Sequence, residues 1–320
     1  MAMVTGSMRI VACAGALLAG GLLGACSTNP TTGRSQFNAL SRDQEVQLGE
    51  QAKDELATEM GGRVTDATLA GYVDEIGRRL VETTYQDDAS LRELPWEFIL
   101  LDSDVVNAFA LPGGKVFMSM GLARRMTNEA QLAAVLGHEI GHVTARHTND
   151  RFARAAGTQL GVGVLAILLG DSGAPLADLG GQVAQIALLK YDRGQELESD
   201  ALGMRYITRA GYDPRGARQV MEILATLERS GRAPEMLSTH PLPESRIRAI
   251  DERIAAEYPQ TQNNPQFRLG EAEFRRRFLS RVTALFPEGR PEDPRVRSFA
   301  IAGGCGGACR DHAAAAASTR

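Results

Sequence analysis

Cysteine is scarce in this chain and absent from its middle. The 320 residues contain four cysteines, Cys13, Cys26, Cys305 and Cys309, so no disulfide can link parts of the segment between about residues 30 and 300. Only 5% of the residues are aromatic, and the formal net charge is −4. This weak negative charge gives no electrostatic reason to expect nucleic acid as a partner. The fold must therefore depend on burial of apolar side chains, or on a bound metal.

Long apolar runs are also lacking, apart from one at the N-terminus. Residues 10–25 follow the single positive charge of Arg9 and consist mostly of small residues and leucine. The run is shorter than the ~20 apolar residues that a transmembrane helix needs. It is typical of the apolar region of a signal peptide, so we predict a signal peptide over residues 1–25.

The apolar run ends in Leu-Gly-Ala-Cys-Ser, with its cysteine at Cys26. This resembles a bacterial lipobox, in which the cysteine becomes the lipid-modified first residue of the mature protein, so Cys26 is the predicted lipidation site and the predicted link to a membrane. An ordinary signal peptide with a cysteine at its cleavage site is the alternative. Ser27 follows, and by resemblance to Gram-negative lipoproteins it favours an outer-membrane anchor that faces the periplasm.

Composition divides the mature chain into three parts. The polar, turn-rich residues 26–40 are predicted to be a lipidated tether, and residues 41–286 a folded domain. Residues 287–320 are rich in proline, glycine and alanine, and we predict a largely disordered tail. The two cysteines of this tail and His312 have the spacing C-x3-C-x2-H. Since they offer three potential ligands outside a folded context, we favour an incidental sequence over a metal site or a disulfide.

Apolar periodicity and capping residues predict a mainly helical domain with a small sheet. Ser41 and Gln44 form a capping box, and Asp66 and Asn128 can each begin a further helix. Further helices are expected from about residue 192, from 214 and from 243, and strands are expected at 96–101, 107–111 and 115–119. The fold class is therefore α+β, with the sheet beside a histidine-bearing helix that is expected to run from 129 to about 149.

Residues 157–190 are rich in glycine and apolar side chains. Their longest apolar stretch, 161–169, is too short to span a bilayer. A buried helix followed by a loop is the favoured interpretation. A mobile apolar flap over an active site or against a membrane is the alternative.

The sequence Gly-His-Glu-Ile-Gly-His places His138 and His142 four residues apart, with Glu139 next to the first. Histidines at this spacing lie on one face of a helix, one turn apart, so both can bind one tetrahedral zinc ion. The adjacent glutamate can reach a water molecule on that ion. Gly137 and Gly141 leave the helix surface thin there, which allows another backbone to approach.

His147 lies nine residues after His138, about 180° around a continuous helix. On that geometry it cannot join the same metal, and we expect it to point away and stabilise the helix end. Thr148 stands where a metzincin would have its third histidine, so the chain is not predicted to be a metzincin.

A third protein ligand must come from another element, because catalytic zinc sites usually have three. Glu196 and Asp200 lie one helical turn apart and about fifty residues downstream. Glu196 is predicted to bind the metal, and Asp200 to accept a hydrogen bond from the far nitrogen of a ligand histidine. Glu198 is expected to point to solvent. The alternative is a charged helix face without a metal.

Taken together, the motifs resemble the HtpX- and CAAX-prenyl-protease-like gluzincin metallopeptidases, and most closely their periplasmic lipoprotein branch (BepA/LoiP-like). The resemblance covers about residues 28–255 and depends on the following segments: NPTTGR at 29–34, NAFALPGG at 107–114, GHEIGHV at 137–143, RH at 146–147, ExxxD at 196–200, and HP at 240–241 with Arg246. The chain shows neither the multiple membrane spans of the prenyl proteases nor the C-terminal repeat domain of BepA. We therefore expect it to be nearer to LoiP.

The resemblance implies a zincin-like domain with one Zn²⁺ per chain and a zinc-dependent endopeptidase activity. The expected setting is the bacterial cell envelope, and the expected substrates are misfolded or assembling envelope proteins in extended conformation. Glu139 is then the general base. The substrate is expected to add a strand along the sheet edge formed by Asn107, Ala108, Phe109 and Ala110.

His240 and Arg246 complete the predicted catalytic set as candidates to stabilise the oxyanion. The resemblance also implies that His240 can bind zinc as a fourth ligand and hold the enzyme inactive. The plainer alternative is that Pro241 begins a helix and Arg246 forms a salt bridge.

Two other functions are compatible with parts of the sequence. A non-proteolytic envelope chaperone or assembly factor could bind strands in the same groove, but it has no need of a general base such as Glu139. A prenyl-processing membrane enzyme is disfavoured because transmembrane helices are missing.

Overall fold

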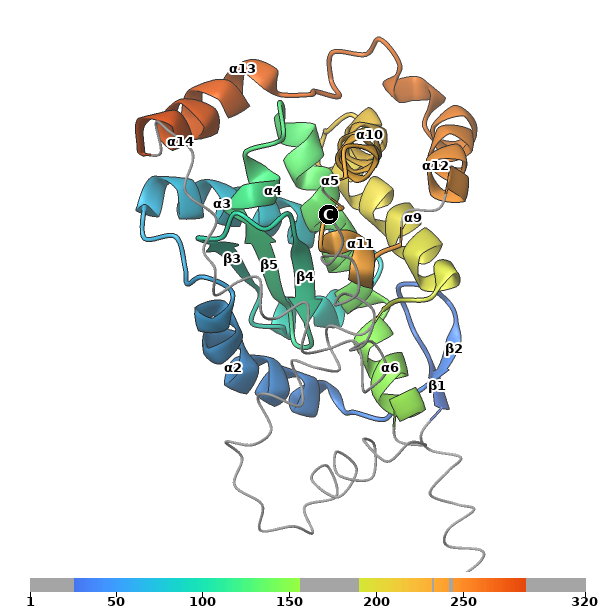
Figure 1. The fold of residues 1–320 in the computed structure, drawn as a ribbon. Coiled ribbons are helices and arrows are strands. Elements are labelled where there is room, and N and C mark those ends of the chain that lie inside the picture. The colour runs from blue at the N-terminus through green and yellow to red at the C-terminus, as the bar shows by residue number, and fades with distance from the viewer. Residues whose placement is uncertain (1–25, 156–189, 232, 242–243, 286–320) are drawn as a thin grey trace, which may run out of the picture.

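The computed structural model describes residues 26–155, 190–231, 233–241 and 244–285. These residues form a mainly helical domain with two small sheets, which confirms the predicted α+β class (Figure 1). The predicted signal peptide, the segment predicted to be a disordered tail and nearly all of the glycine-rich segment lie outside the described residues. No helix among the described residues is long and apolar enough to cross a membrane.

A three-stranded sheet lies at the centre of the domain and contains the predicted strands. Its members are β3 (Glu97–Leu101), β4 (Ala108–Leu111) and β5 (Lys115–Ser119), in the order β3-β5-β4. β5 pairs in parallel with β3 and antiparallel with β4. The turn between β4 and β5 contains Gly113 at φ 73°, where an added Cβ would lie 2.6 Å from the Cα of Val46. Only glycine fits this turn without strain.

The two faces of the sheet pack against different helices. α2 (Arg42–Glu59) covers the face that carries Ile99, Phe109 and Phe117. The rings of Phe109 and Phe117 stack, with their centroids 4.6 Å apart. α3 (Ala67–Thr84) and α5 (Glu129–Thr144) pack against the opposite face. Since successive side chains of a strand alternate between faces, these short strands are buried on both sides.

The strand β4 forms one edge of this sheet within the described part of the chain. The amide of Ser119 donates to the carbonyl of Asn107, at 3.0 Å, just before β4. Hydrogen-bonded and non-bonded pairs alternate in an antiparallel ladder, so the backbone groups of Ala108 and Ala110 face away from β5. β4 therefore offers two sets of outward backbone donors and acceptors beside α5.

Two further long helices complete the layer around α5. They are α9 (Arg193–Arg209) and α10 (Arg215–Arg229). α9 crosses α5 at glycines, because a Cβ added to Gly203 would lie 2.9 Å from the amide nitrogen of His138. A Cβ added to Gly141 would lie 3.0 Å from the carbonyl oxygen of Ser199. The backbone of α9 thus approaches α5 closely at its glycines, as the sequence predicted for this part of the histidine helix.

The remaining elements are short and lie around this core. They are β1 (Cys26–Thr28), β2 (Ser35–Phe37), η1 (Ala89–Glu93), α4 (Met120–Ala123), α6 (His147–Ala155), α11 (Met236–Thr239), α12 (Glu244–Glu257), η3 (Pro259–Thr261), α13 (Glu271–Phe274), η4 (Arg275–Leu279) and α14 (Ser280–Leu285). The helix starts expected from capping residues are confirmed at Ser41, Asp66 and Asn128, each of which accepts a hydrogen bond from the first turn.

The histidine helix is interrupted where a continuous helix was predicted. α5 ends at Thr144, and Arg146 adopts φ 58° before α6 begins at His147. A left-handed conformation costs a non-glycine residue about 1–2 kcal/mol. The guanidinium of Arg146 offsets this cost by donating to Glu45 at 3.0 Å and to the carbonyl of Leu40 at 2.6 Å. The predicted helix end near residue 149 is therefore wrong, because contacts from a distant segment decide the backbone here.

The segment predicted as a tether is an ordered hairpin. β1 and β2 pair antiparallel, with Cys26 opposite Phe37. Asn29 donates through Nδ2 to the carbonyl of Thr144, at 3.0 Å, at the end of α5. Figure 1 shows the hairpin beside α6, so residues 26–37 pack against the domain.

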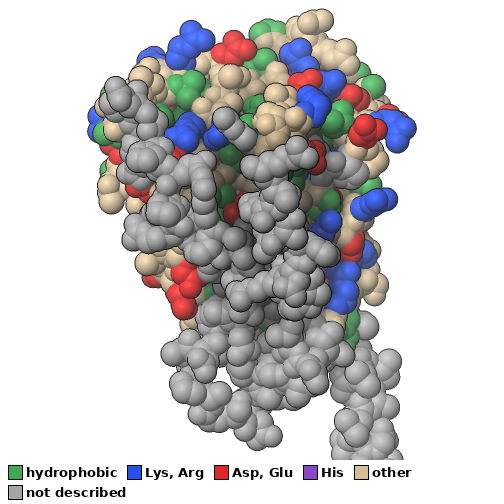
Figure 2. All heavy atoms as spheres, viewed as in Figure 1, with side chains coloured by type: hydrophobic (Ala, Val, Ile, Leu, Met, Phe, Trp, Pro, Cys, Tyr) green, Lys and Arg blue, Asp and Glu red, His purple; other side chains and the backbone are tan. Residues whose placement is uncertain are grey.

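Charged side chains of both signs are interspersed over the described part of the surface in Figure 2. This view therefore shows no broad patch of one sign among the described residues. The pattern agrees with the weak net charge of the chain.

We expect Gly203→Ala to destabilise the protein by about 1–3 kcal/mol, because the added methyl group meets the backbone of α5. Urea unfolding of the metal-free protein measures this change. Gly71→Ala is the matched control, because an exposed helical glycine with no atom within 4 Å of its Cβ position should gain about 0.5–1 kcal/mol. Equal stabilities of the two variants would contradict the close contact of α9 with α5.

Candidate metal centre

Four buried side chains from three helices or their ends converge at one point. His138, His142, Glu196 and His240 each offer one ligand atom, and these atoms lie within 4.8 Å of one another. Nε2 of His142 lies 3.0 Å from Nε2 of His138, and Nδ1 of His240 lies 3.0 Å from Oε1 of Glu196. The structure thus brings together the three predicted ligands and the histidine predicted as an alternative fourth.

Local structure fixes each of these side chains. His138 and His142 are one turn apart on α5, and Glu196 lies in the first turn of α9. The start of α9 is held by a capping box between Asp192 and Gln195. His240 follows α11, and its amide donates to the carbonyl of Met236 at 2.7 Å.

The charges in the cluster are those of a cation site. Burial alone would raise the pKa of Glu196, but His240, His138 and His142 outweigh it and hold that pKa well below its usual range. Burial lowers the pKa of His142 well below 6.5, so its imidazole is neutral, as a metal ligand must be. For His138, burial also disfavours the charge, but hydrogen bonds with Asp200 and Glu196 raise the pKa to about 10. A bound metal would compete with this proton.

Several buried polar atoms at the cluster have no hydrogen-bond partner among the described residues, which indicates whether a metal ion would fit there. Both carboxylate oxygens of Glu139 and Nε2 of His240 are buried and lack hydrogen-bond partners among the described residues. The distance between Oε1 of Glu139 and Nε2 of His240 is 3.7 Å. Burial raises the pKa of Glu139, although His240 and His138 act against this shift. Imidazole nitrogens with one carboxylate suit zinc and similar metals better than magnesium or calcium, so the residues fit such an ion.

Asp200 and Arg246 support the ligands from behind. Oδ1 of Asp200 lies 3.0 Å from Nδ1 of His138, which is the contact predicted for it. Arg246 donates to both oxygens of Asp200 at 2.7 and 2.8 Å, and its Nη1 lies 2.5 Å from Oε2 of Glu196. The guanidinium is 2% exposed. These contacts support a role for Arg246 in holding the two acids of α9, while the predicted catalytic role stays a prediction.

His147 does not point away from the site, and this prediction is wrong. The break at Arg146 turns the chain, so that Nδ1 of His147 lies 2.9 Å from Nδ1 of His142. On its other side, Nε2 of His147 lies 2.8 Å from Oε2 of Glu198. Glu198, which was expected to point to solvent, is thus partnered and only partly exposed. The sequence has no local signal for this arrangement, because it depends on the left-handed residue at the end of α5.

Tyr191 is a second residue that the sequence did not indicate. Its ring stacks on the imidazole of His142, with centroids 3.6 Å apart and planes at 24°. Arg151 donates to its hydroxyl at 2.6 Å, and the guanidinium carbon lies 3.7 Å from the ring centroid. Burial raises the pKa of Tyr191 to about 12, so the phenol is neutral. Tyr191 confines one face of the predicted ligand His142.

The predicted substrate strand lies against α5, the helix that carries His138 and His142. Ala108, Phe109 and Ala110 belong to β4, which contacts α5. Asn107 precedes the strand, donates its amide to Oγ of Ser119 at 3.1 Å, and has a buried Oδ1 without a partner among the described residues. The predicted lipidation site, Cys26, is the first residue of β1 and lies in the hairpin that packs near α6.

Comparison with known proteins gives one family and several relatives. Residues 67–254 match the profile described as "Peptidase family M48". The chain is 35% identical over 235 residues to a "Beta-barrel assembly-enhancing protease" of Yersinia pestis, covering 71% of this chain and 47% of the relative. The protein of the same name from Escherichia coli (strain K12) is 34% identical over 257 residues, with 77% and 51% covered. The chain spans about half the length of these bacterial relatives.

A mitochondrial relative shows the same similarity. The "Mitochondrial metalloendopeptidase OMA1" of Schizosaccharomyces pombe is 33% identical over 233 residues, which are 70% of this chain and 65% of that protein. The bacterial relatives belong to the BepA-like branch that the motifs resemble.

We expect Glu196→Ala to lose bound metal, because the substitution removes the carboxylate that contacts all three histidines of the cluster. Elemental analysis of the purified variant beside the wild-type protein measures this loss. Glu222→Ala, which removes a half-exposed acid of α10, is the control and should retain metal. Full metal content in Glu196→Ala would refute its role as a ligand.

Proposed function

Because the chain belongs to peptidase family M48, we propose that it is a zinc-dependent endopeptidase of the bacterial cell envelope. The family is the kind of metallopeptidase family that the motifs predicted. The observation that carries the proposal is the buried cluster of His138, His142 and Glu196, with the carboxylate of Glu139 beside it, which has no hydrogen-bond partner among the described residues. A protein that only bound its clients would have no use for this combination.

His138, His142 and Glu196 would hold one Zn²⁺ per chain. When bound, zinc makes a water molecule more acidic and polarises the scissile carbonyl group. Asp200 would hold the proton at Nδ1 of His138, so that Nε2 is free for the ion. Arg246 would keep Asp200 and Glu196 in place through its contacts with both carboxylates.

Glu139 would act as the general base. Its carboxylate oxygen accepts a proton from the attacking water and then delivers it to the nitrogen of the leaving amine. Burial raises the pKa of Glu139, and a base with a pKa nearer to neutrality returns its proton more readily. Neither carboxylate oxygen of Glu139 has a hydrogen-bond partner in the described part of the chain, so both are available for this role.

The substrate would bind in extended form along β4. The outward backbone groups of Ala108 and Ala110 can pair with a peptide as an added strand. Such pairing depends on hydrogen bonds to the backbone of the peptide more than on contacts with its side chains. It therefore selects unfolded segments rather than one sequence. Asn107, with its unpaired Oδ1, lies where this edge begins and would contact the same peptide.

His240 would regulate access to the centre. Its Nδ1 lies among the ligand atoms and its Nε2 faces Glu139. The imidazole thus occupies the space between the ligands and Glu139, which water and substrate need. We propose that it is a fourth ligand in the resting state, and that on leaving this place it donates to the oxyanion of the substrate.

The cellular role follows from the relatives and from the N-terminus. Bacterial relatives are named for enhancing β-barrel assembly, which supports misfolded or assembling envelope proteins as substrates. A lipid on Cys26 would anchor the domain to the outer membrane on its periplasmic side. Since β1 begins at this residue, the domain would lie close to the membrane surface.

We expect Glu139→Gln to retain zinc and to lower the cleavage of an unfolded protein by about 10²- to 10⁴-fold, because the amide cannot accept the proton of water. Gel-based cleavage of reduced, unfolded casein, together with elemental analysis, measures both properties. Removing the metal from the wild-type protein should abolish the same cleavage, and restoring zinc should recover it. Unchanged cleavage by Glu139→Gln would refute the mechanism.

A further inference from the structure

The imidazole of His142 is contacted on both of its nitrogens. Nε2 faces the ligand cluster, while Nδ1 faces His147 at 2.9 Å. We propose that His147 is a positioning residue, which accepts the Nδ1 proton of His142 and so leaves Nε2 of His142 free to bind the metal. The inference rests on the proposed function, because it assigns a role at the same centre.

The proton positions follow from the chemistry of the three groups. A neutral imidazole carries its single proton on one nitrogen, and the other nitrogen accepts. If Nε2 of His142 binds a metal, its proton must be on Nδ1, and Nδ1 of His147 must accept that proton. The proton of His147 is then on Nε2, which lies 2.8 Å from Oε2 of Glu198. An ionised carboxylate only accepts, so Glu198 fixes the direction of both hydrogen bonds.

Burial makes this chain of contacts specific. His147 is fully buried, so each of its ring nitrogens needs a partner within the protein. On the other side of Glu198, the guanidinium of Arg34 lies 3.4 Å from its Oε2, and this permanently charged donor favours the ionised carboxylate. His147 cannot itself be a ligand in this arrangement, because it contacts the nitrogen of His142 that faces away from the cluster.

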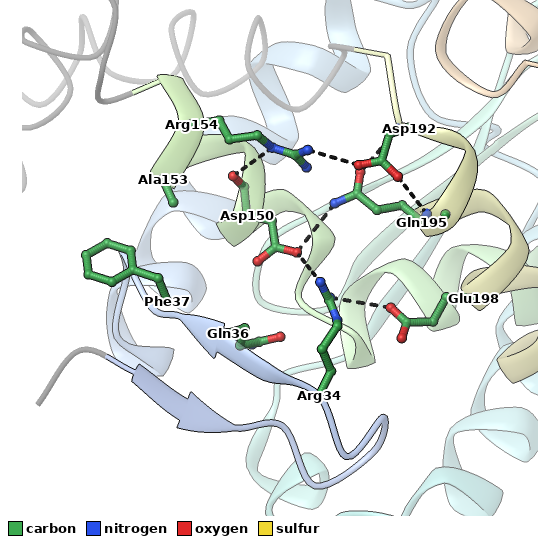
Figure 3. A pocket seen from close by; sticks show the side chains of 10 residues that line it. Arg34, Gln36, Phe37, Asp150, Ala153, Arg154, Asp192, Gln195 and Glu198 are labelled. Atoms are coloured by element: carbon green, nitrogen blue, oxygen red, sulfur yellow. Dashed lines mark hydrogen bonds and ion pairs between the residues drawn. The ribbon is translucent and has the colours of Figure 1, made fainter. Parts of the chain in front are cut away.

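The N-terminal hairpin completes the chain of contacts. Arg34, in the turn between β1 and β2, lies 3.4 Å from Oε2 of Glu198 and 3.1 Å from Asp150 on α6. Figure 3 shows its guanidinium between these two carboxylates, in a pocket of about 490 Å³ bounded by the hairpin, α6 and the start of α9. Arg34 thus holds Glu198 toward His147, so the hairpin supports the metal centre from outside.

Two substitutions at one position separate the hydrogen bond from the space that the ring fills. In His147→Asn, the amide oxygen can take the place of Nδ1 and still accept from His142. In His147→Gln, the longer side chain reaches the place of Nε2 and can still donate to Glu198, but it offers no acceptor of its own at the place of Nδ1. We expect His147→Gln to bind Zn²⁺ about 10- to 100-fold more weakly than the wild type. His147→Asn should stay within about threefold.

Competition with a chromogenic chelator measures zinc affinity, and thermal unfolding of the metal-free proteins checks that both variants fold. In the zinc-loaded wild type, ¹⁵N-correlated NMR of the imidazoles should show the proton of His142 on Nδ1. That signal should persist in His147→Asn and be lost or exchange with solvent in His147→Gln. A purely structural role would weaken both variants equally and leave the proton of His142 in place.

A second pair tests the outer part of the chain. Arg34→Ala should weaken zinc binding by about two- to fivefold, because Glu198 loses its cationic partner. Arg154→Ala is the matched control, since Arg154 lines the same pocket but pairs with Asp192, and it should bind zinc as the wild type does.

The outcomes separate this inference from the proposed function. If wild type binds zinc through Glu196 and cleaves casein, but His147→Gln binds zinc as tightly as His147→Asn, the positioning role is refuted and the proposed function stands. If the wild type binds no zinc, both are refuted.

Discussion

The contact between α5 and α9 is the constraint on which the site depends. Glycines at Gly141 and Gly203 allow the two helices to approach until the backbone of one meets the surface of the other. Only at this separation can Glu196 reach the histidines one turn apart on α5. A larger residue at this helix crossing would push α9 away from α5, and Glu196 would then move away from both histidines of α5.

Burial of so many ionisable groups has an electrostatic cost that the cluster itself must offset. The carboxylates of Glu139, Glu196 and Asp200 lie near the buried guanidinium groups of Arg246 and Arg151, in an interior that disfavours charge. With neutral histidines and ionised carboxylates, the three negative charges outnumber the two positive ones. A divalent cation would offset this excess of negative charge, so metal binding and the stability of the domain should be thermodynamically linked.

Local features of the sequence predicted much of the fold, and distant contacts decided the rest. The helix starts at Ser41, Asp66 and Asn128 follow from side chains that cap their own first turn, and the short apolar segments at 96–101, 107–111 and 115–119 located β3 to β5. Helix spacing was enough to group His138 with His142, and the need for a third ligand led to Glu196. The side chains predicted as metal ligands lie together in the structure.

The failures have one physical origin. A rotation of 100° per residue placed His147 on the wrong side, because it assumed that the helix continues through Arg146. The conformation of that residue is stabilised by Glu45 and Leu40, a hundred residues earlier in the chain. The same break in the helix brings His147 against Glu198. Tyr191 was missed because stacking on a ligand imidazole leaves no spacing pattern in a sequence.

The hairpin at residues 26–37 gives the N-terminal end a mechanical connection to the centre of the protein. Asn29 is bonded to the last turn of α5, and Arg34 is bonded to α6 and α9. Tension applied at the start of β1 would therefore load the junction of these three helices before it reached the sheet. If the protein is attached at its N-terminal end, a pull between that attachment point and a bound client would strain the segment around His142.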